Sequence, residues 1–269
     1  MQDYLSYEAF YTAEQLLYGR RNLVRSMALL CTSFVFFYAA MVFAADKDFE
    51  TDRIKTSKGD LVITFLGHGT LMMSFDGKVI HVDPVAQAVD YARLPKADLI
   101  LVTHEHSDHF DLKAINLIKS KETAYVVTET VARQLKDGII LKNGQIKTVK
   151  GFTIEAVPAY NIVHMRNPGV PFHPKGSGNG YIITFGHKKV YIAGDTENTP
   201  EMKSLKGIDI AFLPMNLPYT MTTEMVADAA KAFRPKILYP YHYGKTKTAK
   251  IIDLLKDEKD IEVRIRRMM

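Results

Sequence analysis

The stretch HEHSDHF, residues 104–110, determines how the rest of this chain is interpreted. His104 and His106 are two residues apart, so in an extended segment their side chains point the same way and can bind one metal ion. Asp108 and His109 follow closely enough to reach a second ion nearby. Three of the chain's nine histidines fall within this stretch, which an ordinary polar surface loop explains poorly. Neutral imidazole and carboxylate suit zinc, and also manganese, iron or nickel.

Short apolar runs rich in Val, Ile, Phe and Tyr surround this motif, and turn signals separate them. One such run directly precedes the motif, and functional side chains often lie on a loop that follows a strand. Strands outnumber helices, so we expect two sheets covered by outer helices. The predicted strands are 61–66, 71–75, 78–82, 98–102, 124–128, 152–157, 180–185, 190–193, 209–213, 236–239 and 261–265. The predicted helices are 111–119, 129–136, 223–233 and 248–257.

The N-terminal part of the chain differs from this pattern. Residues 27–45 carry no charge, and three arginines stand shortly before them. A basic segment, an apolar core and small residues at the end are typical of a secretory signal peptide. The run is also long enough to span a bilayer, so a cleaved signal peptide, an uncleaved membrane anchor and a buried helix all stay open. We assign residues 1–45 to this leader and residues 46–269 to one domain, which both leading interpretations export.

Composition excludes several other classes of protein. A single cysteine rules out a disulfide framework and a Cys-rich zinc module. The net charge is +5, but no Lys/Arg block with interleaved aromatic residues is present, so we expect solvated lysines and no nucleic-acid partner. The expected partner is a small-molecule or lipid substrate, and the N-terminal segment allows an association with the membrane.

The pattern His-x-His-x-Asp-His after a strand resembles the signature of the metallo-β-lactamase superfamily. The resemblance covers roughly residues 60–245 and is closest to metal-dependent hydrolases of the branch that is similar to ascorbate-6-phosphate lactonase and to N-acyl-phosphatidylethanolamine phospholipase D. It implies an α/β fold, a four-layer αββα sandwich with the site at one edge between the sheets. The other matching segments, in order, are ITFLGHGTLMMSFDGKVIHVDP, VPAYN, FHPKGSGNGYII, VYIAGDTE, LPMNLPYTMT and LYPYHYG.

The same resemblance implies further site residues. Asp195 matches the carboxylate that bridges two metal ions, and His242 matches the last ligand of the second ion. His68 and Asp83 match positions close to the cleft, where His68 is a candidate for binding substrate phosphate or metal. For both residues a purely local role in a turn is an equal alternative.

A loop after the predicted strand 209–213 resembles a segment that lines the cleft in the family. It holds Asn216, Tyr219 and Thr220, of which Tyr219 is the predicted substrate-binding residue. Ordinary loop polarity is the alternative. His81 and His187 are expected outside the site, His81 as a packing residue and His187 in solvent.

The third histidine of the first metal site has more than one candidate in this chain. Much of the family has a histidine where this chain has Asn161, and an amide oxygen is a weaker ligand than imidazole for such metals. His164 and His173 are the nearby substitutes, and the resemblance favours His173 in the HPKG segment. The intervening residues 161–178 are rich in Pro and Gly, which predicts a loop that folds back over the metal ions.

The expected function is therefore that of a dinuclear metal-dependent hydrolase. Two divalent ions lower the pKa of bound water and supply a hydroxide that attacks an ester-type bond, in a lactone or a phosphodiester. Asp108 and Asp195 are the predicted catalytic carboxylates, because either can handle the proton. The alternative is a non-catalytic metal-binding or envelope-associated protein on the same fold. A redox di-iron protein is disfavoured by His106, since that resembling branch carries an acidic residue there.

Overall fold

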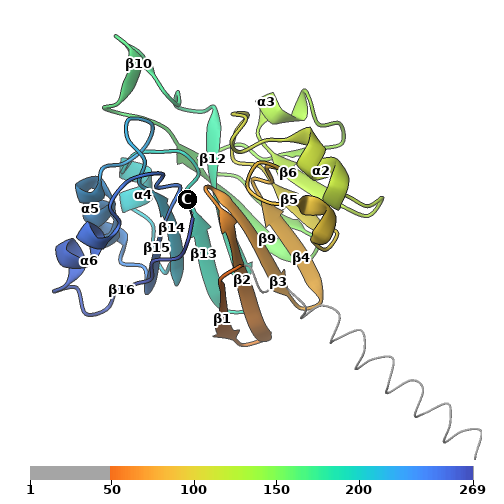
Figure 1. The fold of residues 1–269 in the computed structure, drawn as a ribbon, viewed down its shortest axis with the longest axis horizontal. Coiled ribbons are helices and arrows are strands. Elements are labelled where there is room, and N and C mark those ends of the chain that lie inside the picture. Colours follow the sequence, from red (N-terminus) through yellow and green to blue (C-terminus); the bar gives the residue numbers. More distant parts are fainter. Residues whose placement is uncertain (1–48, 269) are drawn as a thin grey trace, which may run out of the picture. The chain divides into compact units, whose positions relative to one another are not determined.

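Two seven-stranded sheets face each other, and helices cover their outer faces (Figure 1). The computed structural model describes residues 49–268, which belong to one compact unit. The charge-free run 27–45, with its proposed leader function, lies outside the described residues. The predicted α/β sandwich of the metallo-β-lactamase type is confirmed. No helix within residues 49–268 is both long enough and apolar enough to cross a membrane.

The first sheet is continuous along the chain. Its first four strands pair antiparallel, and its last three join in parallel order. The parallel pairs need crossovers, which pass through η1 (Tyr91–Arg93), α2 (Leu112–Ile118) and α3 (Glu129–Ala132). The strands, in spatial order, are β1 (Thr51–Thr56), β2 (Gly59–Gly67), β3 (Thr70–Phe75), β4 (Lys78–Val82), β5 (Leu99–Leu101), β6 (Ala124–Val127) and β7 (Ile139–Ile140).

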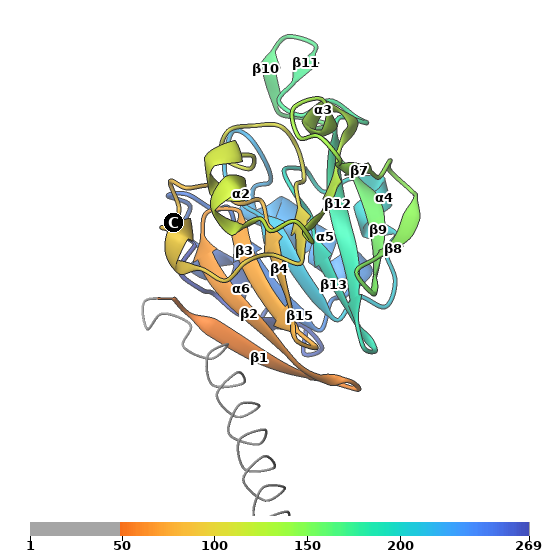
Figure 2. The ribbon, with the colours of Figure 1, turned by 90° about the vertical axis from the view of Figure 1, so that its right-hand side faces the viewer.

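The second sheet repeats this plan, with four antiparallel strands followed by three in parallel. Its crossovers are α4 (Pro200–Lys203), α5 (Thr223–Phe233) and α6 (Ala249–Leu255), on the opposite side of the molecule from α2 and α3 (Figures 1 and 2). The strands, in spatial order, are β8 (Ile146–Val149), β9 (Phe152–Ala159), β12 (Gly178–Phe185), β13 (Lys188–Ile192), β14 (Ile210–Pro214), β15 (Ile237–Tyr241) and β16 (Glu262–Val263).

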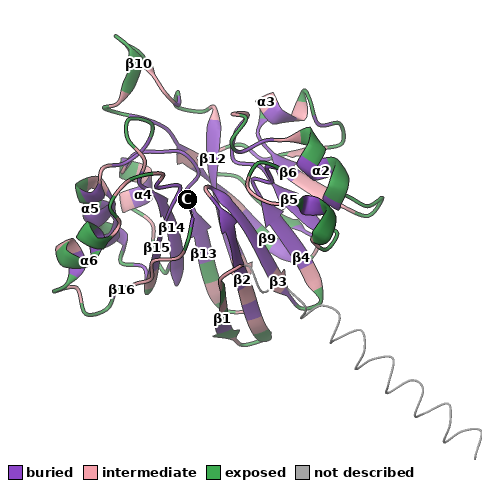
Figure 3. Cartoon of the chain, in the orientation of Figure 1, coloured by how far each residue is buried: buried purple, intermediate pink, exposed green. Residues whose placement is uncertain are grey.

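Strand alternation divides the core into layers. Successive side chains of a strand point to opposite faces, so Leu99 and Leu101 of β5 pack between the sheets while Ile100 packs under the outer helices. Phe212 of β14 belongs to the same central cluster as Leu99 and Leu101. Figure 3 shows the resulting band of buried residues along both sheets. Because both faces of these strands are buried, they read as nearly unbroken apolar runs.

All eleven predicted strands and all four predicted helices overlap observed elements, but some expectations were wrong. The helix predicted for 129–136 ends at Ala132. The segment 161–178 contains no helix, as its Pro and Gly residues predict, but β10 (Met165–Asn167) and β11 (Val170–Pro171) form a two-stranded hairpin within it. This hairpin projects from the end of the molecule near α3 (Figure 2). The strands β1 and β8 were missed because most of their side chains are exposed or half-buried.

Candidate metal centre

The candidate site lies where parallel strands of both sheets end. Asp83 directly follows β4, the HEHSDHF stretch follows β5, and His242 directly follows β15. Asp195 comes three residues after the end of β13. Carboxyl ends of parallel strands meet at one edge of a sheet, where ligands bind in many α/β proteins. The backbone N–H of His242 donates to the carbonyl oxygen of His68 at 3.0 Å, which joins the second sheet to the turn between β2 and β3.

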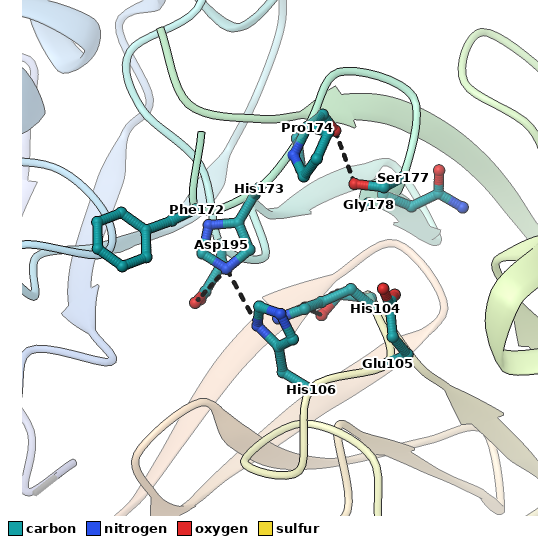
Figure 4. Close-up of a pocket in the computed structure, with 12 residues that line it drawn as sticks. His104, Glu105, His106, Phe172, His173, Pro174, Ser177, Gly178 and Asp195 are labelled. Carbon is teal, nitrogen blue, oxygen red and sulfur yellow. Dashed lines mark hydrogen bonds and ion pairs between the residues drawn. The ribbon is translucent and has the colours of Figure 1, made fainter. Parts of the chain in front are cut away.

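A first group of possible ligands consists of His104, His106 and His173 (Figure 4). One ring nitrogen from each lies within 4.8 Å of the others. The Nε2 atom of His173 is 3.3 Å from the Nδ1 atom of His106. Of the three candidates for the third position, the structure thus brings His173 into the group. His164 instead places its Nδ1 atom 2.5 Å from the Glu197 carboxylate.

A second group consists of His68, Asp108, His109 and His242. The Asp108 Oδ2 atom is 3.1 Å from His68 Nε2 and 3.5 Å from His242 Nε2. His109 and His242 are buried and their rings stack at 4.9 Å, whereas the Asp108 side chain is 49% exposed. Buried imidazoles therefore surround this group on one side, and solvent reaches its ligand atoms at Asp108.

Asp195 lies between the two groups with one carboxylate oxygen toward each. Its Oδ2 atom is 3.3 Å from His173 Nε2 in the first group. Its Oδ1 atom is 3.3 Å from His109 Nε2 and 3.5 Å from His242 Nε2 in the second. A carboxylate in this place can serve both groups at once.

The donor atoms fit divalent metal ions. The Nε2 atoms of His104, His109 and His242 and the Oδ1 atom of Asp195 are buried, and none has a hydrogen-bond partner among residues 49–268. A buried polar atom without a partner lowers the stability of the fold. We therefore expect these atoms to bind a ligand. Atoms bound to a tetrahedral zinc ion at about 2.0–2.1 Å lie about 3.3–3.4 Å apart, close to the separations observed here. Nitrogen and oxygen donors without thiolate suit zinc, manganese, iron or nickel.

Comparison with known proteins agrees with this geometry. The family model of the beta-lactamase superfamily domain matches residues 62–242, which span both sheets and every candidate ligand. The chain belongs to the beta-lactamase superfamily.

Relatives within this superfamily carry hydrolase names. The structure of a proposed metal-dependent hydrolase from Parabacteroides distasonis is 52% identical, with a TM-score of 0.79, over 82% of this chain and 100% of that one. A UPF0173 metal-dependent hydrolase from Thermus thermophilus is 30% identical over 195 residues, 68% of this chain and 83% of that protein. Igni18, a metallo hydrolase from Ignicoccus hospitalis, shares the fold at 24% identity and a TM-score of 0.62, over 77% of this chain and 95% of that one.

Asp83 orients His109, a member of the second group, by contacting the ring nitrogen that faces away from the other candidate ligands. Its Oδ2 atom is 2.7 Å from His109 Nδ1, and its carboxylate also accepts hydrogen bonds from the backbone N–H and hydroxyl of Thr103. With Nδ1 held by Asp83, His109 presents Nε2 toward Asp195. Asp83 is therefore neither a ligand in the groups nor a turn residue only; it is a buried positioning carboxylate. Carboxylates that hold the distal nitrogen of a metal-binding histidine fix its orientation.

Asn161 supports the first group in a comparable way. Its Oδ1 atom accepts from the His173 backbone N–H at 2.9 Å and lies 2.7 Å from His173 Nδ1. Its amide nitrogen donates to Glu197 and to the Tyr219 carbonyl. Asn161 thus replaces no imidazole; it orients the imidazole of His173 so that Nε2 is free for a ligand.

Glu197 is a site residue that the sequence did not reveal. Its buried carboxylate accepts hydrogen bonds from the backbone N–H groups of Ile162, Val163 and His164. These bonds fix the chain where it leaves β9, next to Asn161. The only sequence signal is an acidic residue two positions after Asp195, which is too general to identify the contact.

Burial and charge set the protonation of the histidines. Burial lowers the pKa of His173 to about 4, so its ring is neutral and ready to bind a metal ion near neutral pH. Burial would also lower the pKa of His109, but the carboxylates of Asp195 and Asp83 raise it well above its usual value. Burial opposes ionisation of Asp195, yet His242 and His109 hold its pKa well below the usual range.

The remaining predicted residues lie around the two groups. Tyr219 is 46% exposed, and its ring packs edge-on against Phe172 at 5.1 Å. Asn216 donates its backbone N–H to the Thr220 hydroxyl, so these two residues shape the loop that carries Tyr219. His81 is buried in β4, and exposed His187 accepts a hydrogen bond from the Ser57 backbone, both away from the site.

Close packing at the site also depends on one glycine. A Cβ atom at Gly69 would lie 2.9 Å from the Cε1 atom of His109. That distance is shorter than real carbon contacts, so a side chain at this position would displace His109. The turn between β2 and β3 therefore fits closely against the second group.

Proposed function

We propose that the protein hydrolyses an ester-type bond, in a lactone or a phosphodiester, with two divalent metal ions held in its two ligand groups. Asp195 is the observation that carries this proposal, because its two carboxylate oxygens face the two groups at 3.3 Å. Zinc fits the nitrogen and oxygen donors best, and manganese, iron and nickel are the alternatives. The hydrolase names of the relatives support the same reaction class.

In this proposal His104, His106 and His173 would hold the first ion, and Asp108, His109 and His242 the second, with Asp195 shared between them. When bound, such ions supply Lewis acidity and lower the pKa of bound water. His68 faces the same space from the turn between β2 and β3, and we assign it to substrate or metal.

The two predicted catalytic carboxylates differ in what they can do. Asp195 is 4% exposed and surrounded by imidazoles, so its role is to hold the centre together. Asp108 is 49% exposed and lies at the mouth of the second group, so it can exchange a proton with substrate and solvent. We therefore assign proton transfer to Asp108.

Metal analysis and turnover together test the proposal. The purified full chain should contain two divalent ions, hydrolyse a generic lactone or p-nitrophenyl phosphodiester, lose that activity with a chelator, and regain it with added zinc. A chain that binds two ions but hydrolyses no lactone, phosphodiester or phospholipid in a screen would instead be the non-catalytic metal-binding protein.

We also propose that the domain is exported, with a small-molecule or lipid substrate and no nucleic-acid partner. The uncharged run at residues 27–45 behind three arginines supports export. Protein from the cell envelope should have its N-terminus near Ala45 if the leader is cleaved. An N-terminus at Met1 in the membrane would indicate an anchor, and one at Met1 in the soluble cytoplasm would refute export.

A further inference from the structure

A pocket opens beside the first ligand group, and all three histidines of that group line it together with Asp195. Its empty volume is about 280 Å³, which includes space open to solvent. Three imidazoles and Asp195 form the part nearest the candidate metal centre. Glu105, Ser177, Gly178 and Asn179 also line the pocket.

Glu105 is the one lining residue whose charge the candidate metal centre does not use. It stands between two candidate ligands in sequence, yet it belongs to none of the groups whose ligand atoms lie within 4.8 Å. Figure 4 shows its carboxylate on the same side of the pocket as Ser177 and Gly178. The Oε2 atom is buried and has no hydrogen-bond partner among the described residues.

The donors of the neighbouring Ser177 and Asn179 side chains are already used within the protein, and Ser177 still offers an acceptor. The Ser177 hydroxyl donates to the Pro174 carbonyl at 2.6 Å, which leaves its lone pairs available. The Asn179 amide nitrogen donates to the Leu141 carbonyl and to Tyr181. No lysine or arginine is among the lining residues. A carboxylate in such a lining attracts N–H donors and repels anions.

We infer that this pocket binds an N–H donor of the substrate, most strongly an ammonium group, through the carboxylate of Glu105. The inference rests on the proposed hydrolase function and adds the substrate class to it. Because the pocket adjoins His104, His106 and His173, the bound amine would lie a short distance from the bond that is cleaved. Glu105 is thus a specificity-determining residue, and a donor in the ligand would satisfy its buried oxygen.

Matched substrates test this inference with the zinc-loaded full chain. One pair is the 2-aminoethyl and ethyl monoesters of p-nitrophenyl phosphate, and the other is α-amino-γ-butyrolactone and γ-butyrolactone. Within the pair that is turned over, kcat/KM should be about 10-fold higher for the amine, because a charge-assisted hydrogen bond favours it. The 2-carboxyethyl phosphodiester should be the poorest substrate of its series.

Variants separate Glu105 from general effects. Glu105→Gln should abolish the preference for the amine, so that kcat/KM falls about 10-fold more for the amine than for the partner that lacks it, while the chain still binds zinc. Glu122→Gln, at an exposed turn before β6, is the matched control and should keep the preference. An equal preference in wild type and Glu105→Gln, or no preference in wild type, would overturn the inference.

A binding measurement keeps the two proposals distinguishable. If wild type turns over none of these substrates, the proposed function fails for them, and the pocket is judged by binding of 2-aminoethyl methylphosphonate against ethyl methylphosphonate. Tighter binding of the amine, lost in Glu105→Gln, would still support the pocket. Equal binding of the two phosphonates would refute it.

Discussion

Two clusters of charged and polar groups link distant parts of the chain, and they differ in how completely their atoms are paired. At one, Asp52 of β1 binds the guanidinium groups of Arg264 and Arg266 and accepts a hydrogen bond from the Tyr239 hydroxyl. At the other, Asp195 faces His109 and His242, whose Nε2 atoms lack hydrogen-bond partners among residues 49–268.

This difference indicates that the Asp52 cluster stabilises the fold and that the Asp195 cluster binds a ligand. Around Asp52 each charge meets an opposite charge at hydrogen-bond distance, and the cluster ties β1 to β15 and to the C-terminal segment. Around Asp195 the protein leaves buried donors and acceptors unpaired, which destabilises the metal-free chain. Sites that serve function commonly depart from the pairing rules that the rest of a protein obeys.

The largest effect should come from removing the shared carboxylate. Asp195→Ala should lower activity by about three orders of magnitude, because both groups lose a ligand together. The free energy of unfolding of the metal-free variant should also fall at neutral pH, because His109 and His242 lose the carboxylate that they hold ionised. Metal analysis, turnover and thermal unfolding check this expectation. Activity near that of wild type would contradict the assignment of Asp195 to a metal centre. Asp195 would then serve the fold, as Asp52 does.

A smaller effect should come from the positioning carboxylate of the second group. Asp83→Asn keeps the size of the side chain and tolerates the positive φ of 46° at this position. The substitution should weaken binding of one ion about 10- to 100-fold, because the amide keeps a single acceptor oxygen, which cannot serve both the Thr103 backbone N–H and His109 Nδ1. Competition with a chelator should show one weakened and one unchanged ion. Equal weakening of both ions would contradict the assignment of Asp83 to the second group.

Charge pairing at Asp52 should affect stability and not chemistry. Burial would raise the pKa of Asp52, but Tyr239 and Arg266 lower it below its ordinary value of 3.8. The ionised form therefore stabilises the fold above about pH 4, and this stabilisation is lost as the pH falls through the lowered pKa. Asp52→Asn should reduce the free energy of unfolding by about 2 kcal/mol at pH 7.

Denaturant unfolding at pH 7 and at pH 3 checks this prediction, with exposed Asp253→Asn as the control. The difference between wild type and Asp52→Asn should shrink at the lower pH. Activity per folded molecule should stay at the wild-type level. A loss of activity without a loss of stability would mean that the Asp52 cluster also serves the metal centre.

The sequence was sufficient for the elements that are buried on both faces. Runs such as those of β5 and β14 are apolar because both faces are covered, and such runs are easy to recognise. The edge strands β1 and β8 were missed since solvent-facing strands need few apolar residues. The helix α4 was missed because it has only four residues, although Thr199 caps it and Pro200 begins it.

The residues of the candidate site likewise fall into those that a local sequence pattern identifies and those that it does not. Four of its residues fall within the six-residue stretch HEHSDH, so their spacing alone indicated a metal site. Asp195 and His242 needed the family resemblance, because only the strand order brings them to the same edge. The bonds from Asn161 to His173 and to Glu197 span 12 and 36 residues and depend on side-chain geometry that no local pattern encodes.

Asn161 should affect metal binding less than Asp195 or Asp83, and its variant helps to distinguish the three residues considered for the third position. Asn161 orients His173 without facing the other ligands, so Asn161→Ala should weaken one ion about 10-fold. His173→Ala should cost more, in metal affinity and activity together, because it removes the ligand nitrogen itself. His164→Ala should leave both ions nearly unchanged, since its ring bonds to Glu197 and its loss affects only how that loop is anchored. Zinc titrations of the three variants measure the order of their effects on metal affinity.

If His164→Ala caused the largest loss of affinity and His173→Ala caused none, His164 and not His173 would be the third ligand of the first group. The contact between His164 and Glu197 would then belong to the metal centre and not to the fold.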